Sequence, residues 1–163
     1  TTVTSNVSEI IFNNTYITST YSSYKIIMDG IQITGGGEWG IQLSPDNGTT
    51  FRSSGYHQNR RRHYTTNAGS SYSTNTSHYT THILYDSPAT NDSQLTEITL
   101  GAVTTAQKTL GIQLSGFGDG NTYHTFGYST GRYDTAEAHN ALRFFTGSGN
   151  FTGGTISLFG VKK

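Results

Sequence analysis

Short runs in which apolar and polar residues alternate recur from one end of the chain to the other. Alternation with a period of two is typical of a β-strand that buries one face and leaves the other in water. The pentapeptide GIQLS occurs twice, at Gly40–Ser44 and at Gly111–Ser115, and in both copies an Ile and a Leu flank a Gln. Repeated use of one strand pattern explains this better than a duplication. We therefore expect both strands to point their Ile and Leu into the core.

The alternating runs are bounded by Gly, Asn, Asp and Ser, which are the usual residues of turns. Together the runs predict about ten strands. The expected strands are Val7–Phe12, Tyr24–Ile33, Gly40–Ser44, Tyr56–Thr66, Ser77–Leu84, Leu95–Val103, Lys108–Ser115, Tyr123–Tyr128, Leu142–Thr146 and Thr155–Val161.

The segments between the strands predict turns, one long loop and little helix. Asp46–Gly48, Gly118–Asn121 and Gly147–Asn150 contain Gly, Asn and Asp, which tolerate left-handed backbone in tight turns. Asp134–Ala141 is the only helix-like stretch, and it has room for about one or two turns. Thr65–Thr80 is poor in apolar residues and predicts a long surface loop, of the kind that often contacts ligands.

The composition supports a single all-β domain. A chain of 163 residues suffices for one two-layer core. Thr, Ser, Gly and Asn dominate over helix formers, while 11 Tyr and 8 Phe supply large side chains for the interior. We therefore predict one antiparallel β-sandwich domain that spans residues 1–163.

Charge and apolar content exclude several classes of partner. The 10 basic residues balance 10 acidic ones, which argues against nucleic acid as a partner. No apolar run approaches the roughly 20 residues of a membrane-spanning helix, so we expect no membrane insertion. Cys is absent, so stability must come from the core, helped by oligomerisation.

Two segments carry a resemblance to known proteins. They are Ile41–Phe51, continued through Ser54–Tyr56, and the ending Gly147–Lys162; the early strand Tyr24–Met28 is similar as well. Over most of its length the chain resembles a widespread group of bacteriophage virion proteins, the β-sandwich modules of tail fibres, spikes and capsid decorations. Such modules stand alone or end a longer fibre or spike protein. The resemblance implies a jelly-roll-like fold, a place on the virion surface, and receptor or glycan binding.

Catalytic motifs are missing from the sequence. There is no Gly-x-Ser-x-Gly elbow, no Gly-x-Gly-x-x-Gly, no phosphate-binding loop and no Cys nucleophile. A carboxylate pair for glycoside hydrolysis could come from predicted loops, but solvated turn carboxylates explain these residues better. The acidic residues in question are Glu38, Asp119, Asp134 and Glu137. We expect no enzyme activity.

Metal sites are weakly indicated. His78 and His82 have a spacing that chelates a metal on a helix, but on a strand such residues lie about 13 Å apart. The turns Asp46–Gly48 and Asp119–Asn121 could each offer oxygens to calcium, yet neither has the full spacing of a dedicated calcium loop. We expect no metal and no cofactor, with calcium at these two turns left open.

The segment Tyr56–Tyr64, with the sequence YHQNRRRHY, is unusual for a strand. Neither of its two faces is apolar enough for an ordinary core, so at least one must be hydrated or paired. Arginine beside tyrosine suits acidic sugars or phosphate, through bidentate hydrogen bonds and stacking. An edge strand charged against aggregation, or a strand in a subunit interface, explains the same sequence. Alternation puts Tyr56, Gln58, Arg60, Arg62 and Tyr64 on one face and His57, Asn59, Arg61 and His63 on the other.

Trp39 is the only tryptophan and follows the glycine-rich segment 35–38. This position suits a platform on which a sugar stacks, and it equally suits a side chain that closes the end of the core.

These observations predict a non-catalytic virion-surface module that recognises a host surface polysaccharide. The predicted ligand-binding residues are Trp39, Tyr56, Arg60, Arg62 and Tyr64. The alternative is a structural capsid decoration or fibre connector that works through oligomer contacts. In either case other virion proteins are expected partners, and a homotrimer is the expected assembly.

Overall fold

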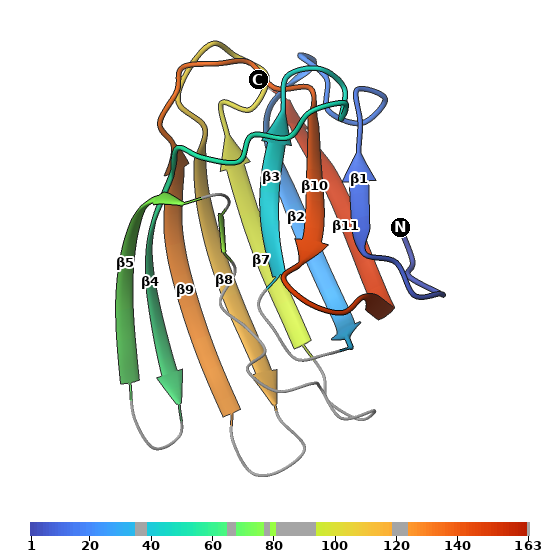
Figure 1. The fold of residues 1–163 in the computed structure, drawn as a ribbon, viewed down its shortest axis with the longest axis vertical. Helices are drawn as coiled ribbons and strands as arrows, with labels where there is room; N and C mark the ends of the chain where they lie inside the picture. The colour runs from blue at the N-terminus through green and yellow to red at the C-terminus, as the bar shows by residue number, and fades with distance from the viewer. Residues whose placement is uncertain (35–38, 65–67, 77–78, 81–93, 119–123, 163) are drawn as a thin grey trace.

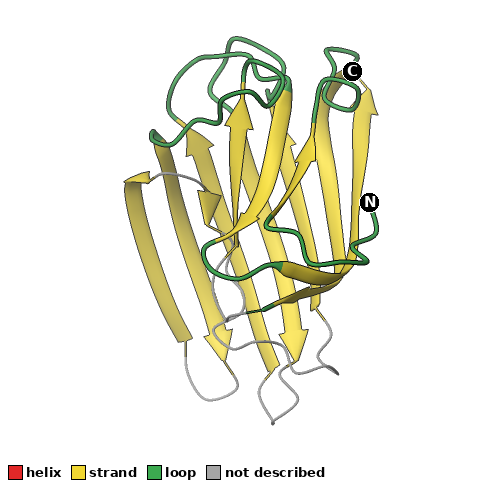
Figure 2. Ribbon diagram, turned by 45° about the vertical axis from the view of Figure 1, so that its right-hand side comes forward, coloured by secondary structure: helices red, strands yellow, loops and turns green. Residues whose placement is uncertain are grey.

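The structure, a computed structural model, describes residues 1–34, 39–64, 68–76, 79–80, 94–118 and 124–162. Every regular element in these residues is a β-strand (Figure 2). None of the described residues belongs to a helix that could cross a membrane. The strands are β1 (Glu9–Phe12), β2 (Tyr21–Ile33), β3 (Trp39–Ser44), β4 (Tyr56–Tyr64), β5 (Ala68–Thr76), β6 (Tyr79–Thr80), β7 (Gln94–Gly101), β8 (Leu110–Gly118), β9 (His124–Tyr133), β10 (Ala141–Thr146) and β11 (Phe151–Lys162).

The strands form two antiparallel sheets that lie face to face (Figure 1). The small sheet has the order β1-β10-β3-β6 and the large sheet the order β11-β2-β7-β8-β9-β4-β5. Strands from the first part of the chain pair with strands from the last part in nested fashion: β2 with β11, β3 with β10, and β4 with β9. Nested pairing rolls a long antiparallel ribbon into a jelly roll. The predicted antiparallel, jelly-roll-like β-sandwich is confirmed.

Large aromatic and aliphatic side chains fill the space between the sheets. Phe144 of β10 lies at the centre of this core, with its ring centroid 6.1 Å from that of Phe12 and 5.7 Å from that of Trp39. Aromatic side chains bury on the order of 150–250 Å² each, so such a cluster supplies much of the driving force for folding. The fully buried members of the core include Ile17, Tyr24, Ile26, Met28, Ile31, Trp39, Ile41, Leu43, Tyr56, Leu100, Phe144 and Phe151.

The predicted long loop is largely a strand. Within Thr65–Thr80, residues Ala68–Thr76 form β5, which pairs with β4 at one edge of the large sheet. The sequence AGSSYSTNT has small polar residues on both faces, so no apolar alternation marks it. Of the predicted strand Ser77–Leu84, only β6 lies within the described residues.

The predicted helical turn at Asp134–Ala141 is wrong. The segment has no helical residue, and its backbone groups bond to distant parts of the chain instead. The Asp134 N–H donates to the Gly55 carbonyl at 2.9 Å, and the His139 N–H donates to the Val103 carbonyl at 2.8 Å. Long-range bonds thus satisfy this backbone, whereas a helix of one or two turns would be marginal by itself.

β8 faces the opposite way from the prediction. Gln113 is buried, whereas Ile112 and Leu114 are 54% and 50% exposed. In β3 the same pentapeptide buries its Ile and Leu, as predicted. The register explains the inversion: Gln113 lies directly opposite the buried Ile98 of β7, and directly opposed residues of neighbouring strands share a face. Alternation gives the period of a strand but does not say which set points inward.

The pairing of β2 with β11 contains an irregularity that only glycine accommodates. The register shifts between Phe151 and Gly153 and again between Gly153 and Thr155. Gly154 has φ +101° and Gly30 has φ +61°, both in the left-handed region. A bulge of this kind bends the strand, and glycine adopts the required backbone without a steric penalty.

Candidate functional site

Two of the predicted ligand-binding residues belong to the core. Trp39 and Tyr56 are each 0% exposed. The hydroxyl oxygen of Tyr56 accepts a hydrogen bond from the Leu43 N–H at 2.9 Å, and burial raises the pKa of this hydroxyl. Neither ring can stack on a ligand from solvent, so the predicted binding role of Trp39 and Tyr56 is wrong. Trp39 closes the core, which is the other interpretation of its position in the sequence.

β4 lies inside the large sheet, between β9 and β5. The interpretation of its charges as protection of a free edge is therefore wrong. The predicted division into two faces is confirmed for the side chains that are described: Gln58 is buried, whereas Asn59 and Arg61 are exposed on the outer face. The side chains of Arg62 and Tyr64 lie outside the described residues, and their role stays a prediction.

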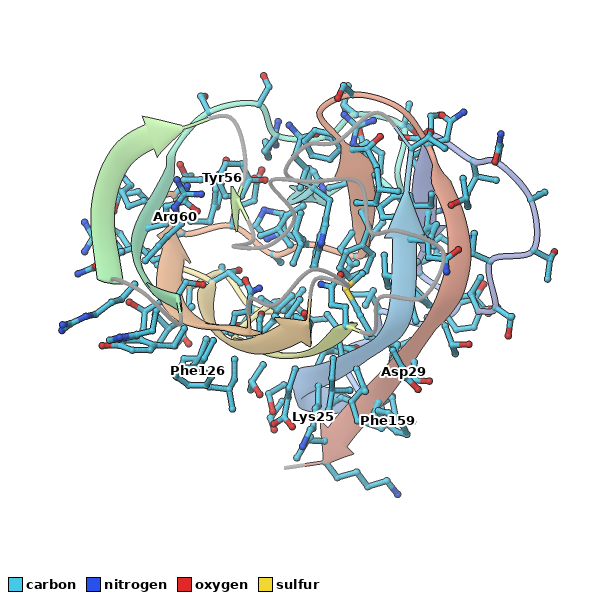
Figure 3. All side chains as sticks on the ribbon, turned by 90° about the horizontal axis from the view of Figure 1, so that it is seen from below. Lys25, Asp29, Tyr56, Arg60, Phe126 and Phe159 are labelled. Atoms are coloured by element: carbon cyan, nitrogen blue, oxygen red, sulfur yellow. The ribbon has the colours of Figure 1, made fainter. Side chains whose placement is uncertain are left out.

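Arg60 lies on the inner face of the large sheet and is half-buried. It stands directly opposite Ser129 of β9. Figure 3 shows Arg60 and Tyr56 within the curve of the sheet, and Phe126 outside it. The guanidinium group therefore belongs to the interior of the curve rather than to its outer surface.

The inner face of the large sheet is polar where β7, β8, β9 and β4 lie side by side. Gln113 Nε2 donates to the Ser115 hydroxyl at 2.7 Å, and the Ser129 hydroxyl donates to Gln113 Oε1 at 3.3 Å. The Thr96 hydroxyl donates to Ser115 Oγ at 3.3 Å, which links β7 to the same network. Burying amides and hydroxyls is costly unless they bond to one another, as they do here. We call this set the inner polar row; its buried members are Gln58, Gln94, Thr96, Gln113, Ser115 and Ser129.

One member of the inner polar row has an unused acceptor. Gln94 Nε2 donates to the Thr96 hydroxyl at 3.0 Å, but Gln94 Oε1 is buried and accepts no hydrogen bond. A buried carbonyl oxygen without a donor costs about 1–3 kcal/mol. A donor from a bound molecule or from water would remove this cost.

A small cavity opens onto the inner polar row. Its wall includes Ile41 of β3, with Gln58, Gln113, Ser129 and Gly131 of the large sheet. The cavity offers ≈ 20 Å³ to the centre of a water molecule, which is room for about one water. A sugar ring therefore does not fit inside it.

The acidic residues near Asp134 are engaged in ion pairs. Asp134 lies 2.5 Å from Lys108 Nζ and 3.3 Å from Arg132 Nε, and the hydrogen bond from Lys108 is the main cause of its lowered pKa. Glu137 forms a bidentate pair with Arg52, which likewise lowers the pKa of the carboxyl group. Carboxylates held in this way stabilise the loop. Glu38 and Asp119 lie outside the described residues.

The buried His139 makes stability depend on pH. Its ring lies edge-on to Tyr133 at 5.1 Å, with Nε2 3.4 Å from Glu137 Oε2, and burial lowers its pKa below 6.5. The unfolded chain thus binds a proton at a higher pH than the folded chain, so stability falls as pH drops below about 6.5. We expect the melting temperature to fall between pH 7 and pH 5, and His139→Phe to flatten this dependence. Parallel curves for the two proteins would contradict the assignment to His139.

The turn at Asp46 is held together by its own donors. Asp46 Oδ1 accepts hydrogen bonds from the Ser44 hydroxyl at 2.7 Å and from the Thr50 N–H at 2.8 Å. These bonds, with a further one from the Thr50 hydroxyl, lower the pKa of Asp46 to about 2. The geometry is that of an ordinary turn, with Asn47 at φ 63°. Among the described residues no group of His, Asp and Glu side chains has the arrangement of a metal site, and the Asp119 turn and both His78 and His82 lie outside them.

Comparisons with known proteins leave the resemblance to virion modules as a prediction. No protein-family model and no curated protein matches the chain. Among solved structures, it is similar to CG-16, a homodimeric agglutinin from chicken liver, at 8% identity and a TM-score of 0.35. It is also similar to two mutants of Congerin II, at 10% and 11% identity and TM-scores of 0.38 and 0.37. Each match covers 93% of this chain and 99% of the other. Similarity at this level carries no conclusion about function.

The sequence singled out β4 but did not show which residues of the neighbouring strands lie beside it. Gln58, Gln113 and Ser129 come together only through the register of β4, β9 and β8. Gln113 was expected to face water, since it lies between Ile112 and Leu114. Knowing which strands neighbour β4 was the missing signal.

Proposed function

We propose that this chain is a non-catalytic glycan-recognition module of the virion-surface kind that its sequence resembles. The observation that carries the proposal is the inner polar row, which leads from a buried network to the half-buried Arg60. A sandwich interior is normally apolar, so a patch of amides and hydroxyls on the inner face calls for a role beyond packing.

The chemistry of the row suits a ligand rich in hydroxyl groups. Amide and hydroxyl side chains both donate and accept, as sugar hydroxyls do. Gln113 and Ser129 stand next to Arg60 along one line across β8, β9 and β4. A guanidinium group at the end of such a line adds a bidentate donor for a carboxylate or sulfate. We therefore propose that the bound glycan is acidic and docks at the Arg60 end of the row.

Arg60→Ala tests this role. We expect the substitution to weaken binding of a uronic-acid oligosaccharide by about 1–3 kcal/mol, because a charge-assisted hydrogen bond is lost. The loss should shrink as salt rises, since screening weakens the charge in the unmodified protein. Titration calorimetry with the isolated chain measures affinity per site without help from multivalency.

Arg61→Ala is the matched control, since Arg61 is the next residue of the same strand and is exposed on the opposite face. We expect it to leave the affinity unchanged. Equal losses for the two variants would mean that only net charge matters, and absence of binding to acidic and neutral glycans alike would refute glycan recognition at this site.

A second candidate function is assembly through subunit contacts. It is favoured by the outer face of the large sheet, where large apolar side chains are exposed. This surface lies on the far side of the sheet from the inner polar row, so the two functions do not exclude each other.

A further inference from the structure

The outer face of the large sheet carries a continuous apolar patch. We call it the outer apolar face; its members are Leu95, Leu110, Ile112, Leu114, Phe126 and Tyr128, each between 43% and 57% exposed. The register places them together: Leu114 stands directly opposite Tyr128, and Gly116 lies between Leu95 and Phe126 in one row. The inversion of β8 is thus part of a larger pattern, in which β8, the neighbouring part of β9 and the first residues of β7 turn polar residues inward and apolar residues outward.

The size of this patch reaches the upper end of what a solitary chain ordinarily exposes. Six half-exposed side chains of this size leave roughly 600 Å² of apolar surface, at the upper end for the largest patch of a monomer. With the polar side chains around it, the face approaches the ~800 Å² that each partner contributes to a stable interface.

Charges flank the outer apolar face asymmetrically. Asp29 and Glu97 lie on the β2 and β7 side, where Lys25 pairs with Glu97 at 2.9 Å. Arg61 and His63 lie on the β4 side, in register with Tyr128 and Phe126. Figure 3 shows Lys25, Asp29 and Phe126 together on the outside of the curve. One flank is therefore acidic on balance and the other basic.

We infer that the outer apolar face is the interface of a two-fold symmetric pair of this chain, with the two large sheets packed face to face. A two-fold axis along β8 lays the β2 and β7 flank of one copy over the β9 and β4 flank of the other. Acidic side chains then meet basic ones twice, once on each side of the axis. An axis across the strands would instead lay each flank over itself, with like charges opposed. The charge pattern thus selects both the partner and the orientation.

The pair leaves the inner polar row of each copy open, because the two rows lie on the far sides of the stacked sheets. The homotrimer expected from the sequence would need another kind of interface. In a three-fold assembly the outer apolar face of one copy would have to meet a different surface of the next copy. The described residues offer no second patch of comparable extent, since Phe159 and Val161 stand apart on β11.

Ile112→Lys tests the pair directly. We expect the unmodified chain to sediment at twice the mass of one chain at micromolar concentration, and Ile112→Lys to raise the dissociation constant at least about 100-fold, because each copy buries the charge at the interface centre. Ile112 is exposed, so the substitution leaves the core intact; circular dichroism checks the fold.

Ile11→Lys is the matched control, since Ile11 is 42% exposed on the small sheet, away from the interface. The Ile11→Lys protein should still sediment at twice the mass of one chain. The reversal Asp29→Arg should weaken the pair, and adding His63→Asp should restore it. Asp29 and His63 end the same row of residues across the sheet, through Leu95, Gly116 and Phe126, so the two positions meet across the axis. A single-chain species for the unmodified protein, a trimer, or indifference to Ile112→Lys would each overturn the inference.

Discussion

Trp39→Ala is expected to lower the free energy of unfolding by about 3–5 kcal/mol. The indole ring is fully buried and packs 5.7 Å from the ring of Phe144, so its removal leaves a cavity at the end of the core. The backbone of β3 is held by its ladder with β10, which limits how far the surroundings can close. Urea unfolding followed by circular dichroism measures the change.

Two comparisons make this result specific. Ile11→Ala removes an exposed side chain from β1 of the same sheet and should change stability by less than about 0.5 kcal/mol. Glycan affinity of folded Trp39→Ala should equal that of the unmodified chain, because the ring faces the core. A stable Trp39→Ala protein that fails to bind glycan would instead restore Trp39 as a sugar-stacking platform.

The fold was predictable because alternating apolar and polar residues mark most of the strands in the sequence. β3 buries its Ile and Leu, and the exposed turn residues Asp46 and Asn47 follow soon after its last residue, so its position followed from sequence alone. β5 was missed because serine, threonine and asparagine populate both of its faces, and its strand state depends on pairing with β4. The segment Asp134–Ala141 was misjudged for the same reason: distant carbonyl groups, invisible in the sequence, satisfy its backbone.

The site was predictable only in part, because the neighbouring strands decide which face of a strand points into the core. Alternation correctly separated Arg60 from Arg61 but could not say which side was the interior. Trp39 and Tyr56 were assigned to ligand contact, yet both side chains are fully buried, and the Tyr56 hydroxyl accepts a hydrogen bond from the Leu43 N–H. In β8 the apolar residues were placed inside by default, whereas the register turns them outward. Where a strand turns its apolar residues outward and its polar residues inward, binding of a partner or ligand is the physical explanation to test first.

The two proposed surfaces give the large sheet two separate roles. A pair joined at the outer apolar face would present its two Arg60 sites in opposite directions, so one pair could bridge two glycan-bearing surfaces. The single chain of Ile112→Lys would keep the affinity of each site but lose this bridging. Binding and assembly can therefore be separated by substitutions on opposite faces of the same strands.

Gly154→Ala is expected to destabilise the fold by about 3 kcal/mol, as the sum of two effects. Gly154 has φ +101°, and a residue with a Cβ pays roughly 1–2 kcal/mol to adopt left-handed backbone. The added Cβ would also lie 2.6 Å from the Gly30 carbonyl oxygen and 2.7 Å from Ile31 Cα, and overpacking of this kind costs about 1–3 kcal/mol. The contacts are with backbone, which cannot rotate away as a side chain would.

Gly116→Ala provides the control for this prediction. Gly116 lies in β8 without a positive φ, and a Cβ there meets nothing within 4 Å. Replacing glycine in a strand removes backbone freedom from the unfolded chain, so Gly116→Ala should be neutral or stabilising by up to about 1 kcal/mol. If the bulge between β2 and β11 requires glycine at position 154, Gly154→Ala lowers the free energy of unfolding, whereas Gly116→Ala leaves it unchanged or raises it. Thermal and urea unfolding measure both changes. If Gly154→Ala were as stable as the unmodified chain, β11 could straighten at this point. The bulge would then not be required for the pairing of β11 with β2.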